Sequence, residues 1–247
     1  MKMRVIALAA LAATVGFTAC KKSKTDDNGT DTNTELATRV AAHTDDQSNF
    51  STQMDDVDND INSVIESNNA FGRVLQQPCN VTVSFDSTQQ LRRVTLTFNG
   101  NNCAGTHART GTIVVTQSIN QRWSDSGAVL TQSINSLKIT RIADNKSITI
   151  NGTRSIRNVS GGRIGQLLAG GRNTIIHAIT GNMGLRFDDS TTRQWNVARR
   201  RTFTRNGQAI ILTVNGDHSA GGLTGIAEWG TTRFGTPFVS RIAVPLK

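Results

Sequence analysis

The feature that most constrains the fold is an alternation of apolar and polar residues that repeats from Cys79 to the end of the chain. Strict alternation over short runs predicts β-strands that bury one face. The apolar members of these runs are Val81/Val83/Phe85, Val94/Leu96/Phe98, Ile113/Val115, Leu137/Ile139, Ile148/Ile150, Ile210/Leu212/Val214 and Ile242/Val244. No helical pattern of similar strength interrupts them, which disfavours parallel βαβ topology. The sequence therefore predicts a mainly β chain, an antiparallel meander of roughly ten to twelve strands over residues 77–247 that forms a barrel, a sandwich or a curled sheet.

Residues that favour turns separate these runs. Asn-Gly pairs begin at Asn99, Asn151, Asn206 and Asn215, and positive φ at such pairs suits tight hairpin turns. A glycine-rich stretch at residues 161–171 is expected to be either a long loop or a linker between two sheets.

Residues 35–76 are expected to form an acidic, amphipathic helical segment. Residues spaced alternately by four and three positions form a helical stripe, and Thr34 is suited to cap its start. The stripe consists of Leu36, Val40, His43, Gln47, Phe50, Met54, Val57, Ile61 and Val64. We expect this helix to lie on the β domain, with a break near residues 43–48; a self-associating coiled coil is the alternative. The alternating acids of residues 56–60 resemble a calcium loop, but Ile61 stands where that loop needs glycine and Ser67 where it needs glutamate.

Charge divides the chain into two parts. Residues 21–66 carry eleven acids and four bases, a net charge of −7, whereas residues 67–247 carry seven acids and 21 bases, a net charge of +14. Eighteen of those 21 bases are arginine. Such a distribution favours either an anionic partner or internal neutralisation of the basic domain by the acidic segment.

The segment from Arg193 to Arg205 is the densest basic and aromatic feature. Strand periodicity would put alternate residues on one face, where forked arginine hydrogen bonds could grip phosphate, sulfate or carboxylate. The candidate anion-binding face consists of Arg193, Trp195, Arg199, Arg201 and Arg205. The alternative is a sheet face whose arginines stack on their own aromatics and are partly neutralised by the acidic segment.

The N-terminus indicates export. Lys2 and Arg4 precede an apolar or small-residue run, residues 5–17, which is too short to span a bilayer comfortably. The sequence Phe17-Thr18-Ala19-Cys20 resembles a bacterial lipobox. That resemblance implies a signal peptide over residues 1–19 and fatty acylation of Cys20, which would hold the protein to a membrane. A plain secretory signal is the alternative. Residues 20–34 have the composition of a flexible tether.

Cys79 and Cys103 are expected to form a disulfide if Cys20 is acylated. Cys79 opens the first predicted strand and Cys103 follows the second, so a hairpin would bring them together. Closing this loop would stabilise the fold by about 3.5 kcal/mol. The alternative is a catalytic thiol, for which His107 is the only nearby histidine.

Sequence motifs for catalysis or metal binding are not evident. GxSxG, HExxH, Walker, Cys-x-x-Cys and Rossmann patterns do not occur, and the four histidines, which include His43, His177 and His218, are isolated. No metal or cofactor is expected. If the chain were a carbohydrate-active hydrolase, its first candidate carboxylates would be Asp188, Asp189 and Glu228.

Taken together, these features resemble a group of uncharacterised Bacteroidota lipoproteins. The resemblance rests on the lipobox, the acidic tether and helix, the Cys79 to Cys103 hairpin, the strand at residues 111–115 and the segment Thr192-Arg193-Gln194-Trp195. It implies export, lipidation and an all-β body, and it carries over no activity and no site residues.

We therefore expect a non-enzymatic binding or structural protein of the cell envelope, anchored to the outer membrane through lipid on Cys20. Anionic glycans are the candidate ligand, and nucleic acid is not expected. A carbohydrate-active hydrolase is one alternative. A lipid or lipoprotein carrier is the other, and it would require an apolar concavity inside a curled sheet.

Overall fold

The computed structural model describes residues 30–66 and 78–245. The chain divides into two units, residues 1–38 and residues 39–247. The predicted signal peptide, Cys20 and the tether up to residue 29 lie outside the described residues, as do residues 67–76 of the predicted helical segment. The first described element is helix α1, Thr30–Glu66. None of the described helices combines the length and the apolar composition needed to cross a membrane.

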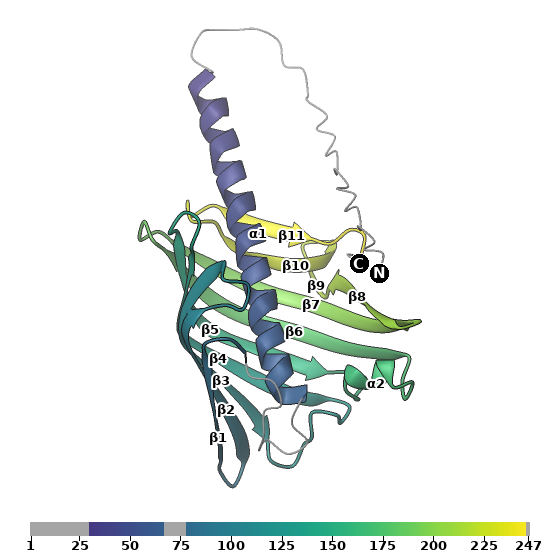
Figure 1. The fold of residues 1–247 in the computed structure, drawn as a ribbon. Coiled ribbons are helices and arrows are strands. Elements are labelled where there is room, and N and C mark those ends of the chain that lie inside the picture. Colours follow the sequence, from purple (N-terminus) through teal and green to yellow (C-terminus); the bar gives the residue numbers. More distant parts are fainter. Residues whose placement is uncertain (1–29, 67–77, 246–247) are drawn as a thin grey trace, which may run out of the picture. The chain divides into compact units, whose positions relative to one another are not determined.

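Eleven strands form one antiparallel sheet, as the alternation predicts (Figure 1). Their bounds are β1 Val81–Ser87, β2 Leu91–Asn101, β3 His107–Ser118, β4 Ala128–Arg141, β5 Ser147–Asn158, β6 Thr174–Phe187, β7 Thr192–Asn206, β8 Ala209–Gly216, β9 His218–Ala220, β10 Leu223–Thr231 and β11 Pro237–Arg241. The order is β1-β2-β3-β4-β5-β6-β7-β10-β11, with β8 paired to β7 and β9 paired to β10. The prediction of a mainly β meander is confirmed. Of the three arrangements considered, the barrel is excluded, because the sheet does not close on itself.

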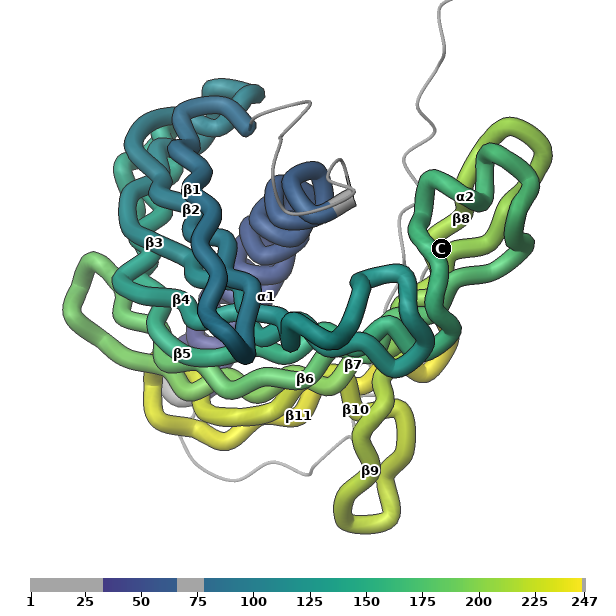
Figure 2. The backbone as a smooth tube through the Cα atoms, turned by 90° about the horizontal axis from the view of Figure 1, so that it is seen from below, coloured from purple at the N-terminus to yellow at the C-terminus, as the bar shows by residue number. Residues whose placement is uncertain are grey.

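The sheet curls around α1, so that one face is concave and the other is turned outward (Figure 2). From Arg39 onward, α1 belongs to the same unit as the sheet. Its apolar stripe from Phe50 to Val64 is buried in one core with the inward residues of β1–β7, and Phe238 of β11 packs against that core. The rings of Phe50 and Trp195 meet edge to face, with centroids 4.4 Å apart. The helix shows no break near residues 43–48, but its stripe is not buried throughout, because Val40 is 56% exposed.

Only one of the four Asn-Gly pairs lies at a two-residue hairpin turn. At Asn206-Gly207, Asn206 is the last residue of β7 and Gly207, at φ of 62°, forms the two-residue loop to β8 together with Gln208. By contrast, Asn151-Gly152 lies inside β5, with Gly152 at φ of 148°. A Cβ on Gly152 would run into the backbone oxygen of Asn182 on β6. Glycine here permits close approach of two neighbouring strands rather than a turn.

One further strand expectation needs correction, and one open alternative is decided. Ile242 and Val244 do not form a strand, because β11 ends at Arg241 and the chain then bends. The glycine-rich stretch joins β5 to β6 of the same sheet, so it is a loop and not a linker between sheets. That loop contains the four-residue helix α2, Gly165–Leu168.

Candidate functional site

The predicted anion-binding face lies in β7, and all of its residues except Arg205 point toward α1 instead of toward solvent. Arg193 and Trp195 are each only 1% exposed, and Arg201 is 8% exposed. Arg199 also faces the helix, where it donates to Ser51 and Glu228. Arg205, near the end of the strand, donates from Nε to the Gly207 oxygen at 3.0 Å. These residues therefore do not form an open surface, because the odd-numbered positions of β7 belong to the concave face that the helix covers.

A buried ion-pair network joins α1 to this concave face. Asp58 accepts hydrogen bonds from Arg154, at 2.8 and 2.9 Å, and from Arg201, at 2.9 Å. Arg201 also donates to Asp55. Burial raises the pKa of Asp58, but the two guanidinium groups outweigh this effect and hold that pKa below its ordinary value. The internal neutralisation considered from the sequence thus occurs at this face.

Further pairs extend the network along α1. Arg109 on β3 donates to Asp60 at 2.6 Å, and Arg193 on β7 donates to Gln47. Asp60 nevertheless has a raised pKa, because its burial outweighs the attraction of Arg109. Acidic residues of α1 thus neutralise arginines that reach them from several strands.

The three carboxylates proposed for hydrolysis do not meet. Glu228 is fully buried opposite Val197, in the middle of β7, and pairs with Arg199. Asp188 and Asp189 lie in the turn that precedes β7, where Asp189 accepts from Thr191 and from Arg233. The structure therefore separates Glu228 from the other two carboxylates. The concave face that a lipid carrier would use is occupied by the apolar side chains of α1.

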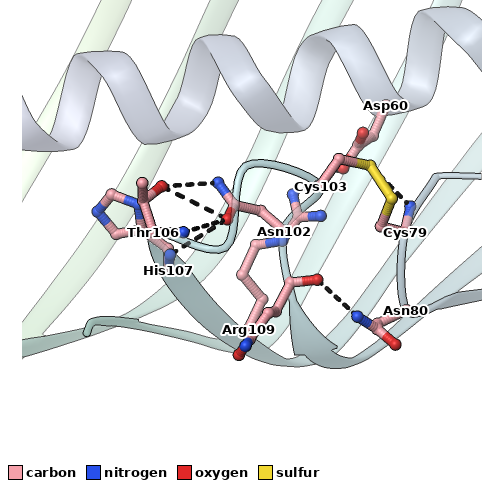
Figure 3. Close-up of a disulfide and its surroundings, with 9 residues drawn as sticks. Asp60, Cys79, Asn80, Asn102, Cys103, Thr106, His107 and Arg109 are labelled. Carbon is pink, nitrogen blue, oxygen red and sulfur yellow. Dashed lines mark hydrogen bonds and ion pairs between the residues drawn. A yellow bond between two sulfur atoms is a disulfide. The ribbon is translucent and has the colours of Figure 1, made fainter.

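The Cys79 and Cys103 sulfur atoms lie at disulfide distance, 2.10 Å, in agreement with the predicted pair (Figure 3). They connect the entry to β1 with the turn between β2 and β3. His107, considered as a partner for a catalytic thiol, is instead within hydrogen-bond distance of Thr106 through Nδ1, at 2.9 Å, and of Gln53 through Nε2, at 3.2 Å. The geometry thus favours a structural pair of cysteines.

The remaining histidines pack against rings. His177 is 3% exposed and lies between Trp123 and Phe203, with centroid distances of 5.0 and 5.3 Å. Burial, assisted by Arg201, lowers the pKa of His177 to about 4. His43 lies against Phe238, and His218 stacks on Trp229. Within residues 30–66 and 78–245, no three histidine, cysteine, aspartate or glutamate side chains gather as a metal site would require.

A surface cleft of about 140 Å³ lies where α1 meets two turns of the sheet. It is lined by residues of α1, of the β4–β5 turn, of the β6–β7 turn and by Arg233 between β10 and β11: Ala42, Asp45, Asp46, Asn49, Arg141, Lys146, Ser147, Ile148, Phe187, Asp188 and Arg233. Acidic, basic and amide groups all reach this cleft, so it offers both donors and acceptors to a polar ligand.

Arg233 lines the cleft and is held in place by two aspartates. It donates to Asp46 at 2.7 and 2.5 Å and to Asp189 at 3.1 Å, and its guanidinium lies 3.8 Å from the centre of the Phe187 ring. Although burial lowers the pKa of Arg233, the two aspartates outweigh this effect and raise it. In the β6–β7 turn and the β4–β5 turn, Asp188 and Lys146 are exposed beside this fixed group.

The outward face of β4–β7 is basic. These four strands contain no acidic residue, and their outward bases are Lys138, Arg157, Arg186 and Arg200. Between the bases lie hydroxyl and amide side chains in register across neighbouring strands; one such line is Ser133, Thr153, Asn182 and Asn196. Arg200 is paired with Asp217, at 3.1 and 3.0 Å.

Three residues at one end of this face lie beside the cleft. Lys138 is opposite Thr149, and Thr149 is opposite Arg186. We call these three residues the basic row. Because Lys138 and Arg186 are two strand spacings apart, their Cα atoms are separated by about 10 Å. Arg186 directly precedes Phe187 of the cleft, and Lys138 lies three residues before Arg141. Because successive residues of a strand point to opposite faces, the basic row lies on the outward face and the cleft on the α1 side, near the same end of these strands.

The sequence contained a signal for the basic row that our reasoning missed. Leu137-Lys138-Ile139 and Leu185-Arg186-Phe187 each place one base between two buried apolar residues, which marks an outward base on a strand. The cleft had no comparable signal, since its lining comes from four distant segments. Comparison with known proteins finds no match: neither a protein-family model, nor a curated protein, nor a solved structure is similar to this chain.

Proposed function

We propose that this chain is a lipid-anchored protein of the outer membrane that binds anionic glycans through the basic row, without chemical turnover. One observation carries the glycan part of the proposal: β4–β7 contain no acid, and their outward bases face solvent, while the acids of α1 pair with inward arginines. The outward face therefore keeps a positive charge that nothing on the same strands cancels.

The chemistry of the basic row fits an acidic sugar chain. Lys138 and Arg186 supply charged donors for carboxylate or sulfate groups, and Thr149 lies between them as a hydroxyl donor and acceptor. The strands are about 4.8 Å apart, a spacing similar to the length of one pyranose unit, so consecutive sugars can meet consecutive strands.

The anchor is supported by the N-terminal sequence. Lys2 and Arg4, the apolar run of residues 5–17 and the small residues before Cys20 are the parts of a lipoprotein signal. On the same basis we propose that the chain belongs with the Bacteroidota lipoproteins that it resembles. Intact mass of the protein from its native membrane, with Cys20→Ser as control, tests the anchor: acylation of the native chain alone is expected, and an unacylated native chain refutes it.

Binding to defined polysaccharides tests the glycan proposal. The full chain, solubilised in detergent, is titrated with dextran sulfate, polygalacturonate and uncharged dextran at low and high salt. We expect both anionic polymers to bind and dextran not to bind, with affinity falling as salt screens the charges. Equal binding of dextran and dextran sulfate would refute the charge-based mechanism.

A matched pair of variants locates the site. Lys138→Gln combined with Arg186→Gln is expected to weaken binding of polygalacturonate about tenfold. The control is Arg122→Gln combined with Arg163→Gln, which removes the same charge from the loops before β4 and before α2. It is expected to weaken binding less than about twofold. If both double variants bind equally well, the basic row is not the site.

A further inference from the structure

β8 is an edge strand with one free side. Among the described strands its only hydrogen-bonded partner is β7, which it meets through the Asn206-Gly207 turn (Figure 1). It also contacts β10, where Gly216 approaches Gly225, and the short helix α2, but neither is a strand partner of β8. The backbone groups on the other side of residues 209–214 therefore face outward from the sheet, as a template for another strand.

The other free edges carry features that discourage strand pairing. β1 carries Asp86, which pairs with Arg93 at 3.5 Å. β11 begins with Pro237 and ends with Arg241, and β9 has only three residues. Charged residues, proline and short length are the usual means by which edge strands avoid association. β8, with the sequence Ala-Ile-Ile-Leu-Thr-Val-Asn-Gly, has neither charge nor proline.

Apolar residues occur on both faces of β8. Leu212 is opposite Phe203 on β7 and is 37% exposed, and Ile210 and Val214 share its face. Ile211 lies on the other face, where a solvated strand would carry a polar residue. An unpaired strand of this composition exposes backbone hydrogen-bonding groups and apolar side chains. A further strand would pair the backbone groups and cover the side chains.

We propose that β8 pairs antiparallel with β8 of a second copy of this chain, across a two-fold axis at Leu212. In that register Ile210 meets Val214 and Ile211 meets Thr213, which are β-branched pairs, and Leu212 meets Leu212 of the second copy. The basic domain as a whole would repel a second copy, but no charge lies between Ala209 and Gly216 to oppose this contact. The contact is self-complementary and closes after two copies, as a two-fold interface must.

Disulfide trapping tests the register directly. In an antiparallel pair the Cα atoms of opposed residues are about 4.5 to 5.5 Å apart, which a disulfide can bridge. Leu212→Cys, in the full chain with Cys20→Ser, is expected to give a covalent dimer on mild oxidation. Val239→Cys on β11 is the matched control, since Val239 is 55% exposed, and it is expected to give at least about tenfold less dimer. Equal trapping at both positions would overturn the proposal.

A charge placed on the edge gives the second test. Ile211→Lys introduces a lysine, which is the residue that most often prevents pairing at natural edge strands. It is expected to abolish disulfide trapping of the Leu212→Cys variant. Thermal unfolding shows whether this variant remains folded. In sedimentation, we expect the chain without cysteine variants to form a dimer and Ile211→Lys to be a monomer. A wild-type monomer, open-ended oligomers or trapping that survives Ile211→Lys would each refute two-fold pairing of β8.

Discussion

The concave and outward faces of this sheet use the same residue types for opposite purposes, and three consecutive residues of β7 show how. Arg199 and Arg201 point toward α1, where they pair with Glu228, Asp55 and Asp58. Arg200, between them, points outward and pairs with Asp217 at the surface. The two-residue repeat of a strand makes this separation, so the face of a base decides its role and the charge count alone does not.

The two faces also differ in what a broken ion pair costs. Asp58 is fully enclosed, and removal of its charge leaves two guanidinium groups without a counter-ion in a dry environment. Asp217 and Arg200 are about one third exposed, and water and salt replace the lost partner there. The concave pairs therefore hold α1 in place, while the outward bases remain accessible to a ligand.

The largest effect is expected from Asp58→Ala. Unpairing Arg154 and Arg201 in the core should lower the free energy of unfolding by about 3 to 5 kcal/mol. Urea unfolding followed by circular dichroism measures this change. Simultaneous replacement of Asp58, Arg154 and Arg201 by Leu, Met and Met should recover most of the loss, because no buried charge is then left unpaired and Asp55, which loses Arg201, is half exposed. A cost below about 1 kcal/mol for Asp58→Ala would show that the concave pairs are solvated like surface pairs.

A large pH effect is expected from His177 on the concave face. Its pKa is lowered to about 4 in the folded state, so between pH 6.5 and 4 only the unfolded chain takes up this proton. Stability should therefore fall as the pH is lowered through this window, by roughly 3 kcal/mol in total. The measurement is urea unfolding from pH 7 to pH 4. In His177→Gln this slope should be much smaller but not absent, because burial also lowers the pKa values of His43 and His107. A slope equal to that of the wild type would assign it to other groups.

An intermediate effect is expected at Gly152, where β5 and β6 approach closely. Gly152→Ala would push a Cβ against the Asn182 backbone at a positive φ, which should cost about 2 kcal/mol. Gly184→Ala, on the neighbouring strand, meets only the end of the Gln194 side chain and should be close to neutral. Chemical denaturation compares the two. Equal losses of stability in the two variants would mean that the close approach of β5 and β6 at Gly152 does not require glycine.

The smallest effect is expected from Asp217→Ala on the outward face. Loss of its pair with Arg200 should cost at most about 1 kcal/mol at low salt and almost nothing at high salt. The cost of Asp58→Ala should be nearly the same at both salt concentrations. Paired urea titrations at two ionic strengths measure both. A salt-sensitive cost at Asp58 would erase the contrast between the faces.

The sequence alone determined the class of fold and much of the helix contact. Alternation at Val94, Leu96 and Phe98 predicted inward-facing strands because a pleated strand has a fixed two-residue period. The stripe from Phe50 to Val64 predicted the buried face of α1 for the same kind of local reason. The pairing of Cys79 with Cys103 also followed from local order, since the two cysteines flank one hairpin.

Only the tertiary structure decided which face of the sheet meets α1. Arg193 and Trp195 share one side of β7 in any strand, but whether that side is solvated depends on the direction in which the sheet curls. Asn151-Gly152 looks like a turn in sequence, yet the register of β5 and β6 places it inside a strand. The cleft has four separate segments as its walls. Such long-range arrangements come from packing the whole sheet around one helix, which no local pattern encodes.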